Sequence, residues 1–76
     1  MKKLLEYITQ ELTGNNQIKI EESDSGDLKI YTIRAPQEVM GLLIGKNGNT
    51  IRAIRSLARA RAIVDQEAVA VRLEEA

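Results

Sequence analysis

Apolar residues at the start of the chain recur at helical spacing. Leu5, Ile8 and Leu12 fall on one face of a helix over residues 2–13, and the positions between them are mostly polar. Gly14 follows at a position where helices commonly end. The pattern therefore predicts an amphipathic helix over residues 2–13.

A strand pattern follows this helix. Residues 18–21 alternate apolar and polar side chains, and residues 24–27 have the Asp, Ser and Gly composition of a tight turn. Residues 28–33 continue the alternation, which predicts a β-hairpin. Tyr31 and Ile33, however, lie at the opposite parity to the apolar residues before them. Either both faces of this strand are partly covered, or a bulge shifts its phase.

Two further helices and a last strand are expected in the second half of the chain. Pro36 suits the first position of a helix over residues 36–44, because the N–H that proline lacks has no partner there. Gly45 ends that helix, and a longer helix follows from about residue 49 to 62. Residues 69–73 alternate again, which predicts a third strand with a frayed end after it. The longer helix is expected to face the core with Ile51, Ile54, Leu57 and Ala58.

The order of these elements is helix, strand, strand, helix, helix, strand. An α+β fold of order α-β-β-α-α-β, with the helices packed on one face of a three-stranded sheet, would bury all the apolar stripes together. The helical crossover before the third strand allows a parallel pair, and therefore a mixed sheet. We expect residues 1–76 to form one domain.

Composition excludes several classes of protein. The chain has no Cys and no His, so a disulfide, a soft-metal site and a thiolate or imidazole catalyst are ruled out. The stretch 41–47 is similar to a Walker A loop, but it is one residue short and has Asn47 where Ser or Thr must reach magnesium. We expect no enzyme, no cofactor and no metal. The apolar runs are too short for a membrane span and form no signal peptide, so we expect a cytoplasmic protein with no membrane partner.

Charge is distributed unevenly although the formal net charge is zero. Residues 36–64 hold five basic residues and one acidic residue, a net charge of +4. Residues 65–76 carry a net charge of −3, and residues 1–34 carry −1. Because the local field and not the net charge attracts a polyanion, the middle of the chain is the candidate binding region. The alternative is that these arginines only solvate an exposed helix face.

The chemistry of residues 45–48, Gly-Lys-Asn-Gly, suits a phosphate-bearing chain. Glycines tolerate a left-handed backbone and have no Cβ to hold a ligand away. Lys46 adds a mobile positive charge, and Asn47 adds hydrogen-bond donors. The helix that follows presents its N–H groups and the positive end of its dipole at the same place. The alternative is a tight turn between two helices with no ligand.

Three arginines extend this basic region along the following helix. At about 100° per residue, Arg52, Arg55 and Arg59 fall within an arc of about 60°, across from the expected core stripe. Arg61 points along the core direction instead. Either the helix has ended there, or the side chain snorkels or pairs with Asp65.

The residues Ile44-Gly45-Lys46-Asn47-Gly48-Asn49-Thr50-Ile51 resemble the I-G-x-x-G-x-x-I signature of the KH domain, whose loop clamps four nucleotides. The order of elements resembles the type II arrangement, and nearly the whole chain is similar to the small bacterial single-KH proteins of the KhpA/YlqC type. The resemblance implies sequence-tolerant binding of single-stranded RNA, in the manner of an RNA chaperone or post-transcriptional regulator. It also implies a homodimer, or a heterodimer with a larger KH protein of the Jag type.

The expected RNA contacts follow from the turn, the arginine face and the apolar residues beside them. Relatives often have a basic residue where this chain has Asn49, so we expect weaker attraction for phosphate here. Bases would lie in an aliphatic groove, for which Ile33, Val39 and Met40 are further candidates. The alternative is a protein-interaction adaptor that docks a partner on helix 36–44, with the glycine loop as a structural turn. The expected RNA-binding residues are Ile44, Gly45, Lys46, Asn47, Gly48, Asn49, Ile51, Arg52, Arg55 and Arg59.

Overall fold

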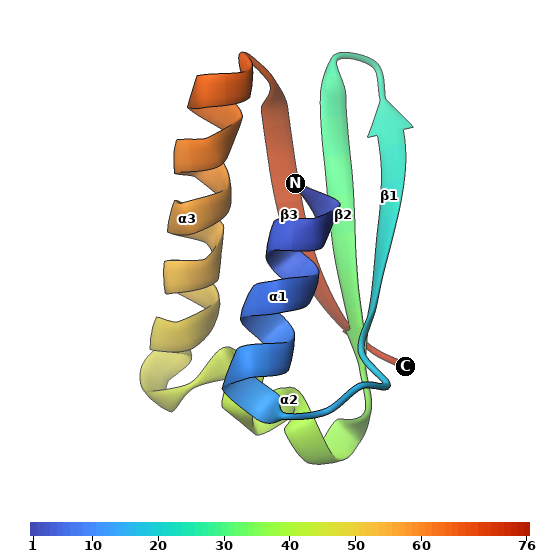
Figure 1. Cartoon of the computed structure of the whole chain (residues 1–76), viewed down its shortest axis with the longest axis vertical. Helices are drawn as coiled ribbons and strands as arrows, with labels where there is room; N and C mark the ends of the chain where they lie inside the picture. The colour runs from blue at the N-terminus through green and yellow to red at the C-terminus, as the bar shows by residue number, and fades with distance from the viewer.

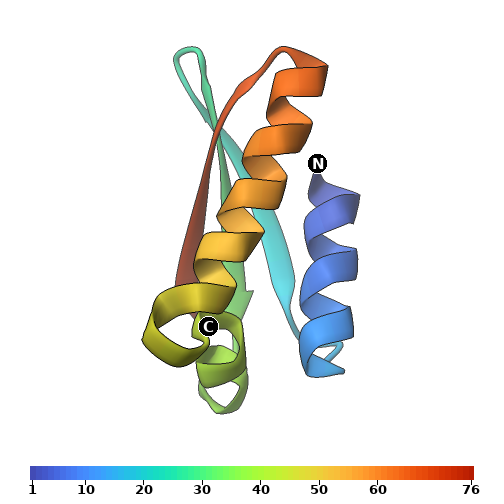
Figure 2. The same ribbon diagram turned by 90° about the vertical axis from the view of Figure 1, so that its left-hand side faces the viewer.

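The first helix and the long third helix cover one face of a three-stranded sheet, and the short second helix packs against both of them at one end of the sheet (Figures 1 and 2). The computed structural model describes all residues, 1–76, and has the expected order α-β-β-α-α-β. No helix is both long enough and apolar enough to cross a bilayer. The elements are α1 (Lys2–Thr13), β1 (Lys19–Ser25), β2 (Leu28–Ala35), α2 (Gln37–Ile44), the 3₁₀ turn η1 (Lys46–Gly48), α3 (Asn49–Asp65) and β3 (Ala68–Glu75).

The sheet is mixed, with β2 in its centre. β1 pairs antiparallel to β2, and β3 pairs parallel to β2 on the other side. The β1–β2 register runs without interruption from Lys19 opposite Arg34 to Ser25 opposite Leu28. No bulge therefore shifts the phase of β2. Its apolar residues instead alternate between the helix-covered face and the open face of the sheet.

The core lies between the sheet and the helices. Leu5 of α1, Ile33 of β2, Leu43 of α2 and Ile54 of α3 each have no more than 1% of their surface exposed. Each such side chain contributes about 1.5–3 kcal/mol by its burial. Each helix thus contributes a fully buried aliphatic side chain to this core.

The buried stripe of α3 differs from the expected one at Leu57. This side chain was expected in the core but is 53% exposed. The residues that α3 buries are spaced three, four and four apart, and the last two are alanines, which allow the helix to lie close to the sheet. Leu57 falls outside this narrow stripe. The buried residues are Ile51, Ile54, Ala58 and Ala62.

The buried stripe of α1 also differs. Leu12 was expected in the core but is 46% exposed, whereas Thr9 is 1% exposed. The Thr9 hydroxyl donates a hydrogen bond of 2.8 Å to the carbonyl oxygen of Leu5, so its burial leaves no polar atom unsatisfied. Periodicity alone missed this threonine because it is scored as polar.

Three boundaries also shift. Pro36 is the N-cap with an extended backbone, and α2 begins one residue later. α3 continues to Asp65, past the expected end at 62. β3 is not frayed after residue 73, because its pairing with β2 extends to Glu75, and the N–H of Ala76 still donates to the carbonyl oxygen of Ala35 at 2.8 Å.

The core assignment predicts unequal effects of two alanine substitutions. Ile33→Ala should lower the free energy of unfolding by about 2–5 kcal/mol, because it leaves a cavity at a fully buried site. Leu12→Ala should lower it by about 1 kcal/mol or less, because about half of the Leu12 surface is already exposed. Urea denaturation of both variants measures this, and equal losses would contradict the core described above.

Candidate nucleic-acid interface

A tight turn joins α2 to α3 and requires an unusual backbone. Gly45, Asn47 and Gly48 all have positive φ angles, of 75°, 57° and 74°. Only Gly adopts this region without penalty, and Asn tolerates it better than most other residues. The Gly-Lys-Asn-Gly sequence therefore places a permissive residue at each of the three positions that need one.

The two glycines of the turn have different roles. A Cβ at Gly45 would lie 2.7 Å from the Cβ of Thr50 and 2.8 Å from its backbone nitrogen, so a side chain there would collide with the first turn of α3. A Cβ at Gly48 would meet no atom within 4 Å. Gly45 is thus needed for packing within the chain, and Gly48 lies beside open space.

Several main-chain donors of the turn are used within it. The N–H of Gly45 donates to the carbonyl oxygen of Gly41 at 2.9 Å, that of Gly48 donates to Gly45 at 3.1 Å, and that of Asn49 donates to Lys46. These three groups hold the turn together. Positive potential toward a partner therefore comes chiefly from the exposed Lys46 side chain, the start of α3 and the arginines beside it.

Arg52 folds back onto the turn. Its Nε atom donates to the carbonyl oxygen of Gly48 at 3.3 Å, and its Nη2 atom donates to the carbonyl oxygen of Asn47 and, at 3.0 Å, to Oδ1 of Asn49. Asn49, the residue after the second glycine, thus helps to orient a guanidinium group beside the turn. The charge of Arg52 is held close to the loop.

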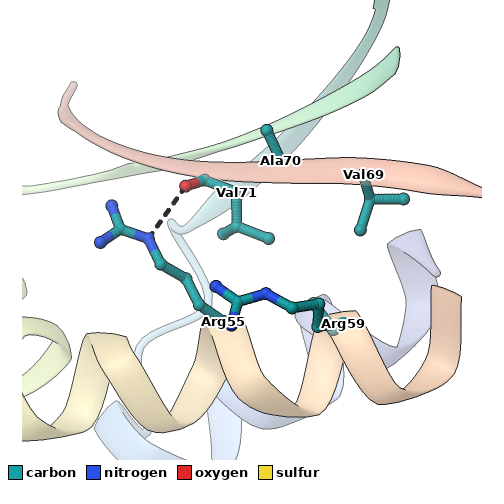
Figure 3. Close-up of a pocket in the computed structure, with 6 residues that line it drawn as sticks. Arg55, Arg59, Val69, Ala70 and Val71 are labelled. Atoms are coloured by element: carbon teal, nitrogen blue, oxygen red, sulfur yellow. Dashed lines mark hydrogen bonds between the residues drawn. The ribbon is translucent and has the colours of Figure 1, made fainter. Parts of the chain in front are cut away.

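Arg55 and Arg59 line a pocket of about 220 Å³ between α3 and β3 (Figure 3). The Nε atom of Arg55 donates a hydrogen bond of 3.2 Å to the carbonyl oxygen of Val71. The remaining lining residues are Ala58, Val69, Ala70 and Val71. We call this site the α3–β3 pocket. Sequence reasoning missed its β3 wall, because nothing in the pattern indicates which strand lies beside α3.

None of the cations around the turn is paired with a carboxylate. Lys46, Arg52, Arg55 and Arg59 make no ion pair, although the chain has as many acidic as basic residues. The ion pairs lie elsewhere and use Lys29, Arg34 and Arg61. The four cations of the turn and α3 therefore remain available to an anion.

Lys29 and Arg61, unlike the cations of the turn, are paired with carboxylates. A hydrogen bond from Lys29 to Glu22, at 3.2 Å, raises the pKa of the lysine above its ordinary value. Arg61 is exposed and pairs with Asp65 at 3.1 Å, so of the three explanations for its position, pairing is confirmed. These groups are neutralised by the chain itself.

The apolar candidates divide into core and surface. Ile51 is 8% exposed and belongs to the core, as do Ile33 and Val39, so they have little surface for a partner. Ile44 is 39% exposed, and Met40 is partly buried. Of these five candidates, only Ile44 and Met40 can provide an aliphatic surface beside the turn.

The fold and the turn together define a KH domain of type II. The chain matches the KhpA/KhpB KH domain family over residues 2–74 and belongs to that family.

Curated relatives agree with this assignment. The chain is 31% identical to the "RNA-binding protein KhpA" of Clostridium acetobutylicum, over 96% of the chain and 99% of the relative. It is 32% identical to the protein of the same name from Chlamydia trachomatis, over 99% of the chain and 97% of the relative. A third relative of that name, from Chlamydia pneumoniae, is 36% identical over 75% of the chain and 74% of the relative.

The two glycines should tolerate alanine differently. Gly48→Ala should lower the free energy of unfolding by about 1–2 kcal/mol, which is the penalty of a left-handed backbone alone. Gly45→Ala should lower it by more, because the new methyl group also collides with Thr50. Thermal or urea unfolding of the two variants measures the difference. A loss at position 48 as large as that at position 45 would contradict the packing role of Gly45.

Proposed function

We propose that this chain binds single-stranded RNA through residues 45–48 and the arginine face of α3. The observation that carries the proposal is the set of four cations beside the turn that have no carboxylate partner. Membership of the KhpA/KhpB family and the similarity to RNA-binding relatives support RNA as the polyanion. Ile51 is proposed only to support the turn from the core. The proposed RNA contacts are Ile44, the turn residues Gly45, Lys46, Asn47, Gly48 and Asn49, and the arginines Arg52, Arg55 and Arg59.

The proposed binding mode is mainly electrostatic. The phosphate backbone would cross the turn, where Lys46 and Arg52 lie, and the bases would enter the α3–β3 pocket. Each phosphate neutralised adds about 0.7 to the slope of log affinity against log salt for a single strand. With two or three such contacts, one domain binds weakly, with a dissociation constant on the order of micromolar. Weak and sequence-tolerant binding suits an RNA chaperone or post-transcriptional regulator in the bacterial cytoplasm.

A protein-interaction adaptor is the competing function. Leu42 is 54% exposed and Ile44 is 39% exposed, so α2 has an apolar surface that a protein partner could cover. Salt distinguishes the two functions. Retention of RNA weakens steeply as the salt concentration rises, whereas apolar docking does not.

Self-association is the second part of the proposal, and the outer face of α3 supports it. Leu57 is 53% exposed and Val64 is 76% exposed. Together with Ala53 and Ala60 they follow a four-three-four spacing, which forms one apolar line along a helix. The two alanines would let a second α3 approach closely. The centre of this line lies more than about 90° from the centre of the arginine face, so a homodimer would leave both RNA surfaces free.

A homodimer would also raise the affinity for RNA. Two weak sites on one strand act together and increase avidity by a factor of roughly 10² or more when both engage. A heterodimer with a larger KH protein of the Jag type would use the same apolar line and is the alternative occupant. The family name, which joins KhpA with KhpB, supports that alternative.

Reversal of charge in the turn tests the RNA proposal. Lys46→Asp combined with Asn47→Asp should weaken binding of single-stranded RNA by roughly tenfold or more, because it removes a cation and adds two anions beside phosphate. Fluorescence anisotropy with labelled oligonucleotides, at several salt concentrations, measures the affinity and the salt slope. Circular dichroism confirms that the variant is folded.

A matched control separates the site from the overall charge. Lys3→Asp combined with Gln66→Asp makes the same total change in charge, and Gln66 has a left-handed backbone that Asp tolerates. Both residues are exposed and lie away from the turn, at the start of α1 and the end of α3 (Figure 1). The control should keep most of the affinity. If both variants lose the same amount, or neither loses any, the turn is not the RNA site.

A separate substitution tests the homodimer. Leu57→Glu should convert the dimer to a monomer, because it places a charge in the apolar line. Leu12→Glu introduces the same charge at another exposed leucine, on α1, and should leave the dimer intact. Analytical ultracentrifugation over a range of protein concentrations measures both. A parent chain that sediments as a monomer at every concentration refutes self-association.

A further inference from the structure

Asn47 and Gly48 form an Asn-Gly pair within the α2–α3 turn, and this pair of residues is prone to a covalent change. The main-chain nitrogen of the residue after an asparagine can attack the side-chain amide carbon, and a glycine at that position has no Cβ to hinder the approach. Asn47 is exposed, and a Cβ at Gly48 would meet no atom within 4 Å. The surroundings of the pair are therefore open to water.

Deamidation at this pair takes place in two steps. The Gly48 nitrogen loses its proton and bonds to Cγ of Asn47, the bond between Cγ and the side-chain nitrogen breaks, and ammonia leaves with the proton. Water then opens the resulting succinimide ring at one of its two carbonyl carbons. Opening at Cγ gives aspartate, and opening at the main-chain carbonyl carbon gives isoaspartate. Either product has a carboxylate in place of a neutral amide.

The folded turn holds the two reacting groups apart. Ring closure requires the Gly48 nitrogen to approach Cβ of Asn47 about the Cα–C bond. The ψ angle of Asn47 is 25°, so this nitrogen is instead nearly eclipsed with the main-chain nitrogen of Asn47 and points away from Cβ. The Gly48 N–H also donates to the carbonyl oxygen of Gly45 at 3.1 Å, which disfavours the loss of its proton. Deamidation therefore requires the turn to open.

Arg52 holds the turn in this protected form. Its guanidinium group donates hydrogen bonds to the main-chain carbonyl oxygens of Asn47 and Gly48. A change in the ψ angle of Asn47 moves the first of these oxygens, so the turn cannot open without breaking that hydrogen bond. The hydrogen bonds of Arg52 therefore oppose the rotation that deamidation needs.

The other asparagines are poorer candidates and serve as internal controls. Asn15, Asn16 and Asn49 are followed by Asn, Gln and Thr, whose side chains hinder the attack. The side-chain oxygen of Asn15 accepts a hydrogen bond of 2.7 Å from the N–H of Gln17, and that of Asn49 accepts one of 3.0 Å from an arginine. At Asn47 it is the main-chain oxygen that accepts, so its side-chain amide is not held in this way.

We propose that Asn47 is a site of spontaneous deamidation, that the reaction proceeds from an opened turn, and that Arg52 slows it by keeping the turn closed. The product carries a carboxylate beside Lys46 and Arg52, so it lowers the positive charge of the turn by one unit. Aspartate tolerates the left-handed backbone at this position, whereas isoaspartate adds a carbon to the main chain of the turn. The modification does not depend on RNA, but its effect, a weaker attraction for phosphate, rests on the proposed function.

Incubation at mildly alkaline pH, followed by proteolysis and mass spectrometry, tests the site. Asn47 should show the mass gain of an amide converted to a carboxylate, and Asn15, Asn16 and Asn49 should stay unchanged. The same chain unfolded in guanidinium chloride is the reference, and Asn47 should react there at least about tenfold faster, because no turn protects it. An Asn47 that stays intact in the folded chain would overturn the site. Equal rates in the folded and unfolded chains would overturn the protection.

Two arginine variants test the role of Arg52. Arg52→Met removes its hydrogen bonds to the turn and should accelerate the reaction of Asn47 on the order of threefold to tenfold. Arg59→Met removes the same charge from the same helix, but the hydrogen bonds of the turn do not involve Arg59, so the rate should stay at the parent's value. Both side chains are exposed, and circular dichroism checks that both variants fold. If Arg52→Met reacts no faster than Arg59→Met, Arg52 does not protect the turn.

RNA binding separates this inference from the proposed function. The deamidated chain, isolated by anion-exchange chromatography, should bind single-stranded RNA roughly threefold or more weakly than the parent, because a carboxylate lies beside the phosphates. Bound RNA should also slow the reaction of Asn47. If Asn47 reacts but the parent binds no RNA at low salt, the modification stands and the proposed function fails. If the parent binds RNA with steep salt dependence while Asn47 stays intact, the proposed function stands and this inference fails.

Discussion

The left-handed backbone of the α2–α3 turn is the constraint on which the rest of the structure depends. Three of four consecutive residues have positive φ, and Gly45 lies against Thr50 in the first turn of α3. This contact fixes where α3 begins and how it is rotated. The rotation places its alanine-rich stripe on the sheet and its arginines beside the turn and the edge of β3. Arg52 then reinforces the same turn through hydrogen bonds to its carbonyl groups.

Much of the fold was predictable because its signals are local. The element order follows from periodicity and from a few Gly, Pro and Asn residues, and four consecutive residues suffice to recognise the Gly-x-x-Gly turn. The failures all concern properties that need the tertiary structure. Leu57 lies outside a buried stripe that can be recognised only once Ala58 and Ala62 are known to be buried. The β3 wall of the pocket could not be predicted, because strand order is not a local property.

The positions of the charged residues near the turn follow from the sequence more closely than the burial of the apolar residues beside them. Arginine spacing on one helix is set by helical geometry, so Arg52, Arg55 and Arg59 were grouped correctly on one side of α3. Ile51, in contrast, follows the second glycine and belongs to the core, where it anchors the start of α3. An apolar residue near such a turn either packs in the core or is exposed to a partner. Only its burial in the structure distinguishes these two cases.

Although the net charge of the chain is zero, its paired and unpaired basic residues lie in different parts of the fold. Acidic residues are used where they neutralise Lys29, Arg34 and Arg61, on β2 and at the far end of α3. None of the cations near the turn forms an ion pair with an acidic residue, so no direct contact neutralises their charge. A folded chain can therefore attract a polyanion at one end while its net charge stays at zero. Because such a field acts over a short range, the attraction is confined to the surface around the turn and is not averaged out by the acidic residues elsewhere in the chain.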